Sequence, residues 1–218
     1  MTDPDPFRSP EEALISICLS AHADAGTEAL SLDDGATLLV GAADSGKAKR
    51  LASTGKAFGE RFFFHHAGLG GETGNPDLFL WRLMHWLRKT GHFPDPIPAD
   101  PEVQREALPN WLARAAAGGN LCIAIADGQS LTKNGLEPDL EWLPEWLPPG
   151  VRIIVSVKPG PDAELWRERI NNAVEHQTEG DAKSLRQLGR ETLGEPAARR
   201  VAELLWCSRN GMALNDLS

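Results

Sequence analysis

The chain has 218 residues, 41% of them hydrophobic, with 22 basic against 31 acidic residues and a formal net charge of −9 at pH 7. This acidity argues against a general nucleic-acid binder and against a protein that binds anionic membranes, because either needs a basic face. No apolar run approaches the roughly 20 residues of a membrane helix, the start has no signal-peptide pattern, and three scattered cysteines fit reduced core residues. We therefore expect a cytoplasmic protein without a membrane or nucleic-acid partner.

Predicted helices and strands alternate along the chain. A helix capped by Ser9 is followed by strands at 36–40, 61–66, 121–126, 151–157 and, more weakly, 172–177, with helices after Lys47, from Pro76, before Gly118, near 162–170, near 181–190 and at 196–208. Residues 68–77, GLGGETGNPD, are predicted to be a flexible loop with Pro76 opening the next helix, and 91–101 a proline-rich linker. The strands are continuous apolar runs, which indicates an α/β fold with a parallel sheet flanked by helices. We expect an N-terminal extension and helix over 1–35, an α/β domain over 36–178 and a C-terminal helical segment over 179–218.

The stretch LLVGAADSGKAKRLA, residues 38–52, contains the spacing of a phosphate-binding loop, with Gly41, Gly46 and Lys47 at the positions of G-x-x-x-x-G-K. The motif is not rare in a chain with 21 glycines, but here it follows a predicted strand and opens a predicted helix, as a working loop requires. Glycines let backbone N–H groups turn around a phosphate, while the helix N-terminus and the lysine supply positive charge. The next position should be Ser or Thr and is Ala48.

A second candidate lies at the end of the strand LCIAIA, where Asp127 follows directly. In an open parallel sheet, ligands bind at the carboxyl ends of the strands, so Asp127 and the 41–47 loop should share one rim with the strand end at 156–160. A carboxylate there can hold Mg²⁺, usually through water. The alternative is that Asp127 only caps a turn.

Histidines and tryptophans offer weaker candidates. His65 and His66 are adjacent on a strand and point to opposite faces, so they cannot easily share a metal. One of them could face a nucleotide, but we interpret them as half-buried polar groups. Trp81, Trp86, Trp142 and Trp146 are expected to contribute core and rim packing.

From about residue 36 to its end, the chain resembles the signal-transduction NTPases with numerous domains (STAND), in particular their NACHT-like branch in bacterial and nephrocystin-type proteins. The 38–52 stretch matches the first nucleotide motif and NLCIAIADGQSL matches the second. LEWLPEWLPPGVRIIVSVKPG is similar to the family's run into its sensor strand, and RRVAELLWCSRNGMALNDLS is similar to the helix that opens a winged-helix part.

The resemblance implies a P-loop NTPase sheet of five strands (ASCE-type), with the 36–40 strand beside the 151–157 strand, and binding of ATP or GTP with Mg²⁺. It places the phosphate cradle at Gly41, Asp44, Ser45, Gly46, Lys47 and Ala48. Asp127 would be the metal-side acid and the candidate catalytic group, and Ser156 with Lys158 would occupy the sensor position. The C-terminal helical segment would be a shortened winged-helix remnant. Its apolar Leu204, Leu205, Trp206 and Met212 lead us to expect that this end either packs back on the sheet domain or forms the surface for a protein partner.

Two departures from the family pattern concern catalysis. Ala48 has no hydroxyl for Mg²⁺, and Ser130 stands where the family usually has a second acid that orients water. Phosphoryl transfer depends on metal charge and positioning, so we expect a nucleotide-binding switch or adaptor with weak or absent hydrolysis. A slow Mg²⁺-dependent ATPase of a signalling or conflict system, and a structural protein that kept the fold without the ligand, stay open as alternatives.

Overall fold

The computed structural model describes residues 15–16, 18–19, 30, 35–43, 45–133, 135–170 and 174–178. Most of the helix predicted after Ser9, the helices predicted near 181–190 and at 196–208, and the winged-helix remnant lie outside this set. The proposed boundaries at residues 35 and 178 stay predictions.

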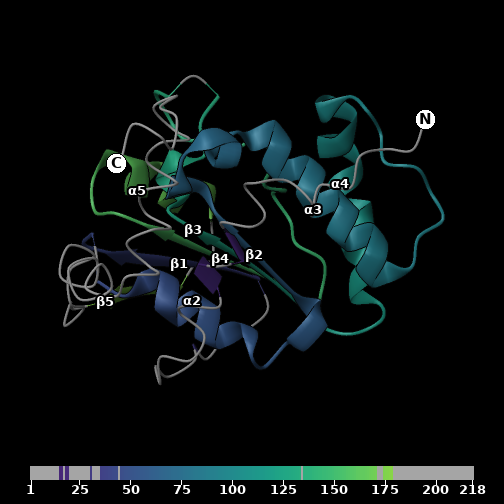
Figure 1. Ribbon diagram of the computed structural model, residues 1–218, viewed down its shortest axis with the longest axis horizontal. Helices are drawn as coiled ribbons and strands as arrows, with labels where there is room; N and C mark the ends of the chain where they lie inside the picture. The colour runs from purple at the N-terminus through teal and green to yellow at the C-terminus, as the bar shows by residue number, and fades with distance from the viewer. Residues whose placement is uncertain are drawn as a thin grey trace, which may run out of the picture. The chain divides into compact units, whose positions relative to one another are not determined.

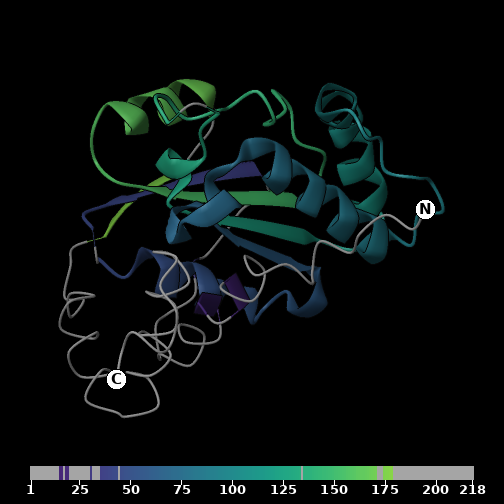
Figure 2. The same cartoon turned by 45° about the horizontal axis from the view of Figure 1, so that its top comes forward.

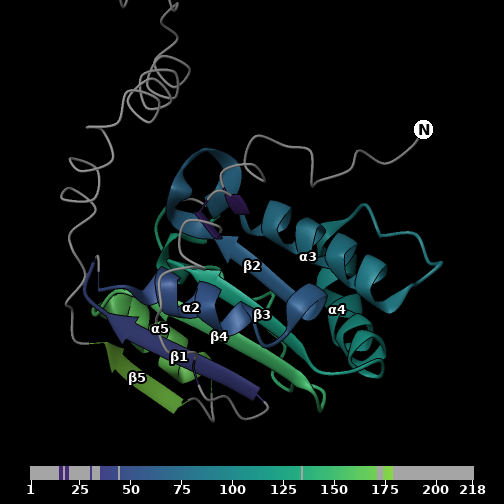
Figure 3. The same ribbon diagram turned by 60° about the horizontal axis from the view of Figure 1, so that its bottom comes forward.

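Five parallel strands form one sheet in the order β2-β3-β4-β1-β5, which Figure 3 shows as arrows that point the same way. The strands are β1 (Gly35–Gly41), β2 (Phe62–His66), β3 (Leu121–Ala126), β4 (Val151–Val157) and β5 (Val174–Thr178). The predicted pairing of the 36–40 strand with the 151–157 strand is confirmed, with Leu38 in register with Val155. The predicted parallel α/β class is confirmed as well.

Within the described residues, the helices with complete bounds are α2 (Lys47–Gly55), α3 (Pro76–Gly91), α4 (Pro101–Ala116) and α5 (Pro161–Arg169). The side chain of Asn75 accepts the N–H groups of Asp77 and Leu78 at the start of α3, and Asp100 caps α4 in the same way. Both of these helices have proline in the first turn, where the missing N–H costs no helical bond. Within the described residues, we find no helix with the length and apolarity that a bilayer crossing requires.

The segment between β2 and α3 is more ordered than the predicted flexible loop. It contains two short 3-10 turns, Ala67–Leu69 and Gly71–Gly74. Thr73 is wholly buried in it, and its hydroxyl donates to the carbonyl oxygens of Ala67 and Gly70. The prediction of a flexible loop is wrong here, because the buried hydroxyl of Thr73 forms hydrogen bonds with two carbonyl oxygens of the turn and so fixes its backbone.

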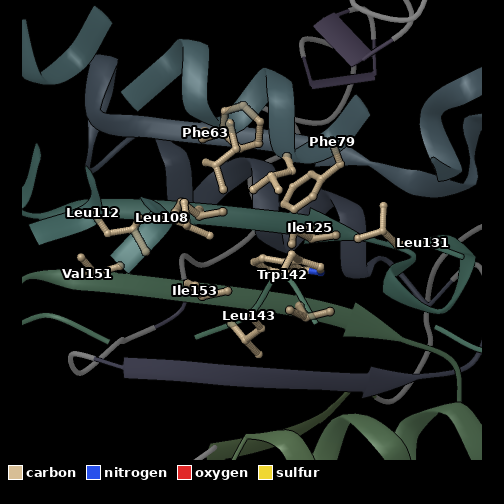
Figure 4. Close-up of a cluster of buried hydrophobic side chains, with 14 of the residues drawn as sticks. Phe63, Phe79, Leu108, Leu112, Ile125, Leu131, Trp142, Leu143, Val151 and Ile153 are labelled. Carbon is tan, nitrogen blue, oxygen red and sulfur yellow. The ribbon is translucent and has the colours of Figure 1, made fainter. Parts of the chain in front are cut away.

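Helices cover both faces of the sheet, with α3, α4 and α5 on one side and α2 on the other (Figures 1 and 2). Side chains alternate between two cores along β1 to β4, as the period of two requires. Figure 4 shows the first core, in which Phe79 of α3 and Phe63 of β2 lie against Ile125 and Ile153 of the central strands. The second core lies under α2 and includes Leu39, Leu51, Phe64, Cys122, Ala124, Ile154 and, from the described residues before β1, Ile15 and Leu30.

Candidate functional site

The 41–47 loop connects a buried strand to the N-terminus of a helix. β1 ends at Gly41 and α2 begins at Lys47, with Gly46 at the N-cap in a left-handed conformation, φ 81°. Glycine adopts this conformation without steric cost. Asp44, one of the predicted cradle residues, lies outside the described part of the chain. The strand, loop and helix that the motif requires are therefore all present.

Lys47 turns its ammonium group back into the loop. Its Nζ donates to the carbonyl oxygens of Gly41 at 2.8 Å and Ala42 at 2.5 Å, and lies 3.5 Å from Ser45 Oγ. The residue is only 5% exposed. A buried ammonium needs such acceptors, because an unpaired charge away from water is very costly. The loop thus already holds one positive charge at the start of α2.

Asp127 lies at the same edge of the sheet as this loop. It follows β3 directly, and its left-handed backbone, φ 55°, is one that Asp tolerates better than most residues. Its N–H donates to Ser156 Oγ on β4 at 3.2 Å, and β4 lies between β3 and β1. The sheet order therefore places Lys47, Asp127 and Ser156 at the same edge of the sheet, as predicted.

The two sensor candidates differ in their surroundings. Ser156 is buried, and its hydroxyl fixes the backbone of Asp127. Lys158 is exposed, and its backbone N–H donates to Gln129 Oε1 at 3.2 Å. The structure brings Ser156 into contact with Asp127 and places Lys158 directly after the end of β4.

Asp127 has two neighbours that the sequence did not assign to it. The Nε2 atom of His66, the last residue of β2, lies 4.0 Å from Asp127 Oδ2. Gly68 lies so close that a Cβ built on it would be 2.5 Å from the same oxygen. The sequence predicted both β2 and β3 as strands of one parallel sheet. Residues at the carboxyl ends of two such strands become neighbours when the strands pair, as β2 and β3 do.

His65 is a structural residue on the other face of β2, and it is not half-buried as predicted but only 1% exposed. Its Nε2 bonds the carbonyl oxygen of Thr73 at 2.8 Å, and Arg82 Nη1 lies 2.5 Å from its Nδ1. Burial, and then the charge of Arg82, lowers the pKa of His65 to about 3. Since Arg82 can only donate, the neutral ring carries its proton on Nε2 and donates to Thr73. His65 thus anchors the 67–74 turn that places Gly68 beside Asp127.

The described cysteines are free thiols that remain protonated. Burial, and then the negative charge of Asp127, raises the pKa of Cys18 to about 11. Burial raises the pKa of Cys122 to about 12, against the opposing effect of Arg152. The described residues contain no group of three or more His, Cys, Asp or Glu residues that could hold a metal ion.

Comparisons with known proteins support the fold. No protein-family model matches the sequence, and no curated protein matches it. A chain in the structure of Drosophila ORC bound to GC-rich DNA and Cdc6 is similar, with a TM-score of 0.50 and 12% identity over 100% of this chain and 81% of that chain. The Aeropyrum pernix ORC2 protein in ADPNP and ADP complexes gives a TM-score of 0.42 and 13% identity, over 88% of this chain and 51% of that chain. The first match shows a shared parallel α/β fold flanked by helices.

Proposed function

We propose that this protein is a nucleotide-binding module for ATP or GTP that hydrolyses its ligand weakly or not at all and acts through protein partners. The observation that carries the proposal is the 41–47 loop, which joins buried β1 to the N-terminus of α2 and holds the Lys47 ammonium. Free N–H groups at a helix N-terminus and a lysine are the groups that bind phosphate. Asp127 and Ser156, at the same edge, complete the candidate site.

Weak hydrolysis follows from two side chains. Ala48 follows Lys47 in the first turn of α2 and carries no oxygen. Ser130 lies in the 3-10 turn after Asp127, and its N–H donates to the Asp127 carbonyl oxygen at 2.8 Å. Its hydroxyl cannot accept a proton from water as a carboxylate can. Because phosphoryl transfer relies on charge and positioning, each departure should lower turnover.

The resemblance to NACHT-like NTPases supports the part of the proposal that concerns switching and protein partners. We propose the C-terminal segment, residues 179–218, as the partner surface. A structural neighbour was solved with DNA, but the net charge of −9 argues against a DNA partner for this chain.

Isothermal titration of the full chain with ATP and with GTP tests the proposal. Lys47→Ala should weaken binding by about tenfold or more, because a charge-assisted phosphate contact contributes about 1.5–3 kcal/mol. The wild-type ammonium must exchange part of its contact with Gly41 and Ala42 for the phosphate, which places the loss nearer the lower figure.

Lys56→Ala is the matched control, since Lys56 is an exposed lysine just after the opposite end of α2, about 13 Å away by helix rise. It should bind nucleotide as the wild type does. Absence of nucleotide binding by the wild type, or equal losses in the two lysine variants, would contradict the proposal.

A further inference from the structure

We propose that a pocket at the amino-terminal edge of the sheet binds a small organic anion, a carboxylate or phosphate monoester on an apolar body. The pocket has a volume of about 390 Å³ and lies between the C-terminal end of α2 and the starts of β3 and β4. In Figure 3 this is the edge away from the arrowheads, whereas the 41–47 loop follows the arrowhead end of β1. The inference does not depend on the proposed nucleotide site.

Positive charge gathers at this pocket in a chain whose net charge is −9. Arg61, which directly precedes β2, and Arg152, the second residue of β4, both line it, and none of its described lining residues is acidic. The fork of donors on arginine matches the geometry of carboxylate and phosphate groups. A hollow lined by one sign of charge concentrates ions of the opposite sign. The charge of the pocket therefore favours an anion.

Backbone contacts hold the Arg61 guanidinium in place without neutralising its charge. Its Nε donates to the carbonyl oxygen of Asn120 at 3.2 Å, and its Nη2 donates to those of Ala115 at 2.6 Å and Gly119 at 2.7 Å. A guanidinium carries five N–H donors, so these bonds occupy the one on Nε and both on Nη2. Within the described residues, Nη1 has no hydrogen-bond acceptor and the side chain has no ion pair. An oxyanion can therefore accept from Nη1 while all three bonds remain.

Arg152 departs from the pattern of its strand, because it is the only residue of β4 that is not buried. Side chains alternate along β4, so Arg152 lies on the same face as Ile154, at the border of the second core. It is in register with Cys122, and its charge opposes the effect of burial on the pKa of that thiol. Its guanidinium carbon lies 5.5 Å from the ring centroid of Phe58, a cation–π contact. Residues that break a local pattern in this way are expected at functional sites.

Apolar side chains provide the surface for the body of the ligand. Leu30, Ala57 and Phe58 line the pocket beside the two arginines. The backbone N–H of Leu30 donates to the Thr54 hydroxyl at 3.1 Å, which fixes this residue at the end of α2. Small-molecule sites measure about 300–1,000 Å³ and combine apolar lining with a few polar groups. The volume of this pocket lies near the lower end of that range, so we expect a small ligand.

NMR titration of the full, isotope-labelled chain tests the inference. The probes are phenylacetate and phenyl phosphate, which share a ring and differ in the anion, with phenylacetamide as the uncharged control and acetate as the control without an apolar body. We expect saturable shifts at residues 54–61, 120 and 152, a Kd of about 1 mM or lower for at least one probe, and binding of the two controls that is weaker by about tenfold or more. The tighter probe identifies the head group. No saturable binding of either probe, or equal binding of phenylacetamide, overturns the inference.

Arg152→Met removes one positive charge and keeps a long side chain beside Phe58. It should weaken binding of the better probe by about tenfold or more, which is about 1.4 kcal/mol, because a charge-assisted contact is lost. Arg88→Met is the matched control, since Arg88 is a half-buried arginine on α3, on the other face of the sheet. It should bind the probe as the wild type does. Equal affinities of Arg152→Met and the wild type overturn the inference.

Ala57→Phe tests the pocket without removing a charge. Ala57 is exposed, so the variant should unfold thermally as the wild type does, while the larger side chain fills the pocket and abolishes binding. Lys47→Ala separates this pocket from the 41–47 loop and should bind both probes as the wild type does. Unchanged binding in Ala57→Phe overturns the inference. Loss of binding in Lys47→Ala places the anion at the loop, which overturns the inference and supports the proposed function.

Discussion

Gly68→Ala tests how closely the 67–74 turn packs against Asp127. A Cβ at residue 68 would lie 2.5 Å from Asp127 Oδ2, 3.1 Å from its Cβ and 3.2 Å from its Cγ. Rotation of the carboxylate could relieve the first contact. The contact with Cβ persists, because that atom moves only with the backbone. Either the turn or the residue after β3 must therefore shift.

The expected change in stability is the difference between two opposing effects. Replacing glycine with alanine stabilises a protein by about 0.4–1 kcal/mol where the site can accept the methyl group, because the unfolded chain loses freedom. Overpacking a filled site costs about 1–3 kcal/mol. The net loss should be about 1–2 kcal/mol. Gly68 does not have positive φ, so backbone strain adds nothing to this figure.

Gly118→Ala is the matched control, since its added Cβ would meet Arg61 Nη1 at an ordinary 3.4 Å. Urea unfolding followed by tryptophan fluorescence should show Gly68→Ala less stable than wild type, and Gly118→Ala as stable or slightly more stable. Titration should also show weaker nucleotide binding for Gly68→Ala, because the added methyl group displaces Asp127 at the proposed site. Equal stability and equal affinity of the two alanine variants would refute the packing argument.

Two further changes test the buried histidine and the expected weakness of hydrolysis. The pKa of His65 is lowered from 6.5 to about 3 in the folded protein, so its contribution to stability is present above pH 6.5 and is lost by about 1.4 kcal/mol per pH unit as the pH falls toward 3. His65→Gln should therefore show a flatter loss of unfolding free energy between these pH values, and parallel curves for the two proteins would contradict this. Ala48→Ser should introduce Mg²⁺-dependent binding, and adding Ser130→Asp should raise phosphate release by more than the product of the single effects, because metal and water act on one transition state. Wild-type turnover of about 1 s⁻¹ or faster, near the low end of ordinary enzyme rates, would show that the site is not impaired.

Local sequence patterns were sufficient for β1 to β5, for α2 to α5 and for the class of sheet, but not for the ordered 3-10 turns between β2 and α3. The uninterrupted apolar run of β3 and the largely apolar sequence of β4 are needed only in strands buried on both faces, and the structure buries both faces. Asn75 before Pro76, and Asp100 before Pro101, mark helix starts through contacts within three residues. These features depend on residues that are neighbours in the chain, so they can be recognised without knowledge of the tertiary contacts. The pairing of β1 with β4 came instead from the family resemblance.

By itself, the sequence determined the strand, loop and helix around Lys47 and the parallel α/β class, because burial pattern and turn chemistry are local properties. Only the tertiary structure decided what surrounds Asp127. His66 and Asp127 are distant in the chain, and they meet because β2 pairs with β3 in a register that places His66 opposite Ala126. The burial of His65 likewise depends on Thr73 and Arg82, which lie in a turn and a helix outside its strand. Contacts of this kind follow from strand order, register and helix placement, and no short stretch of sequence contains that information.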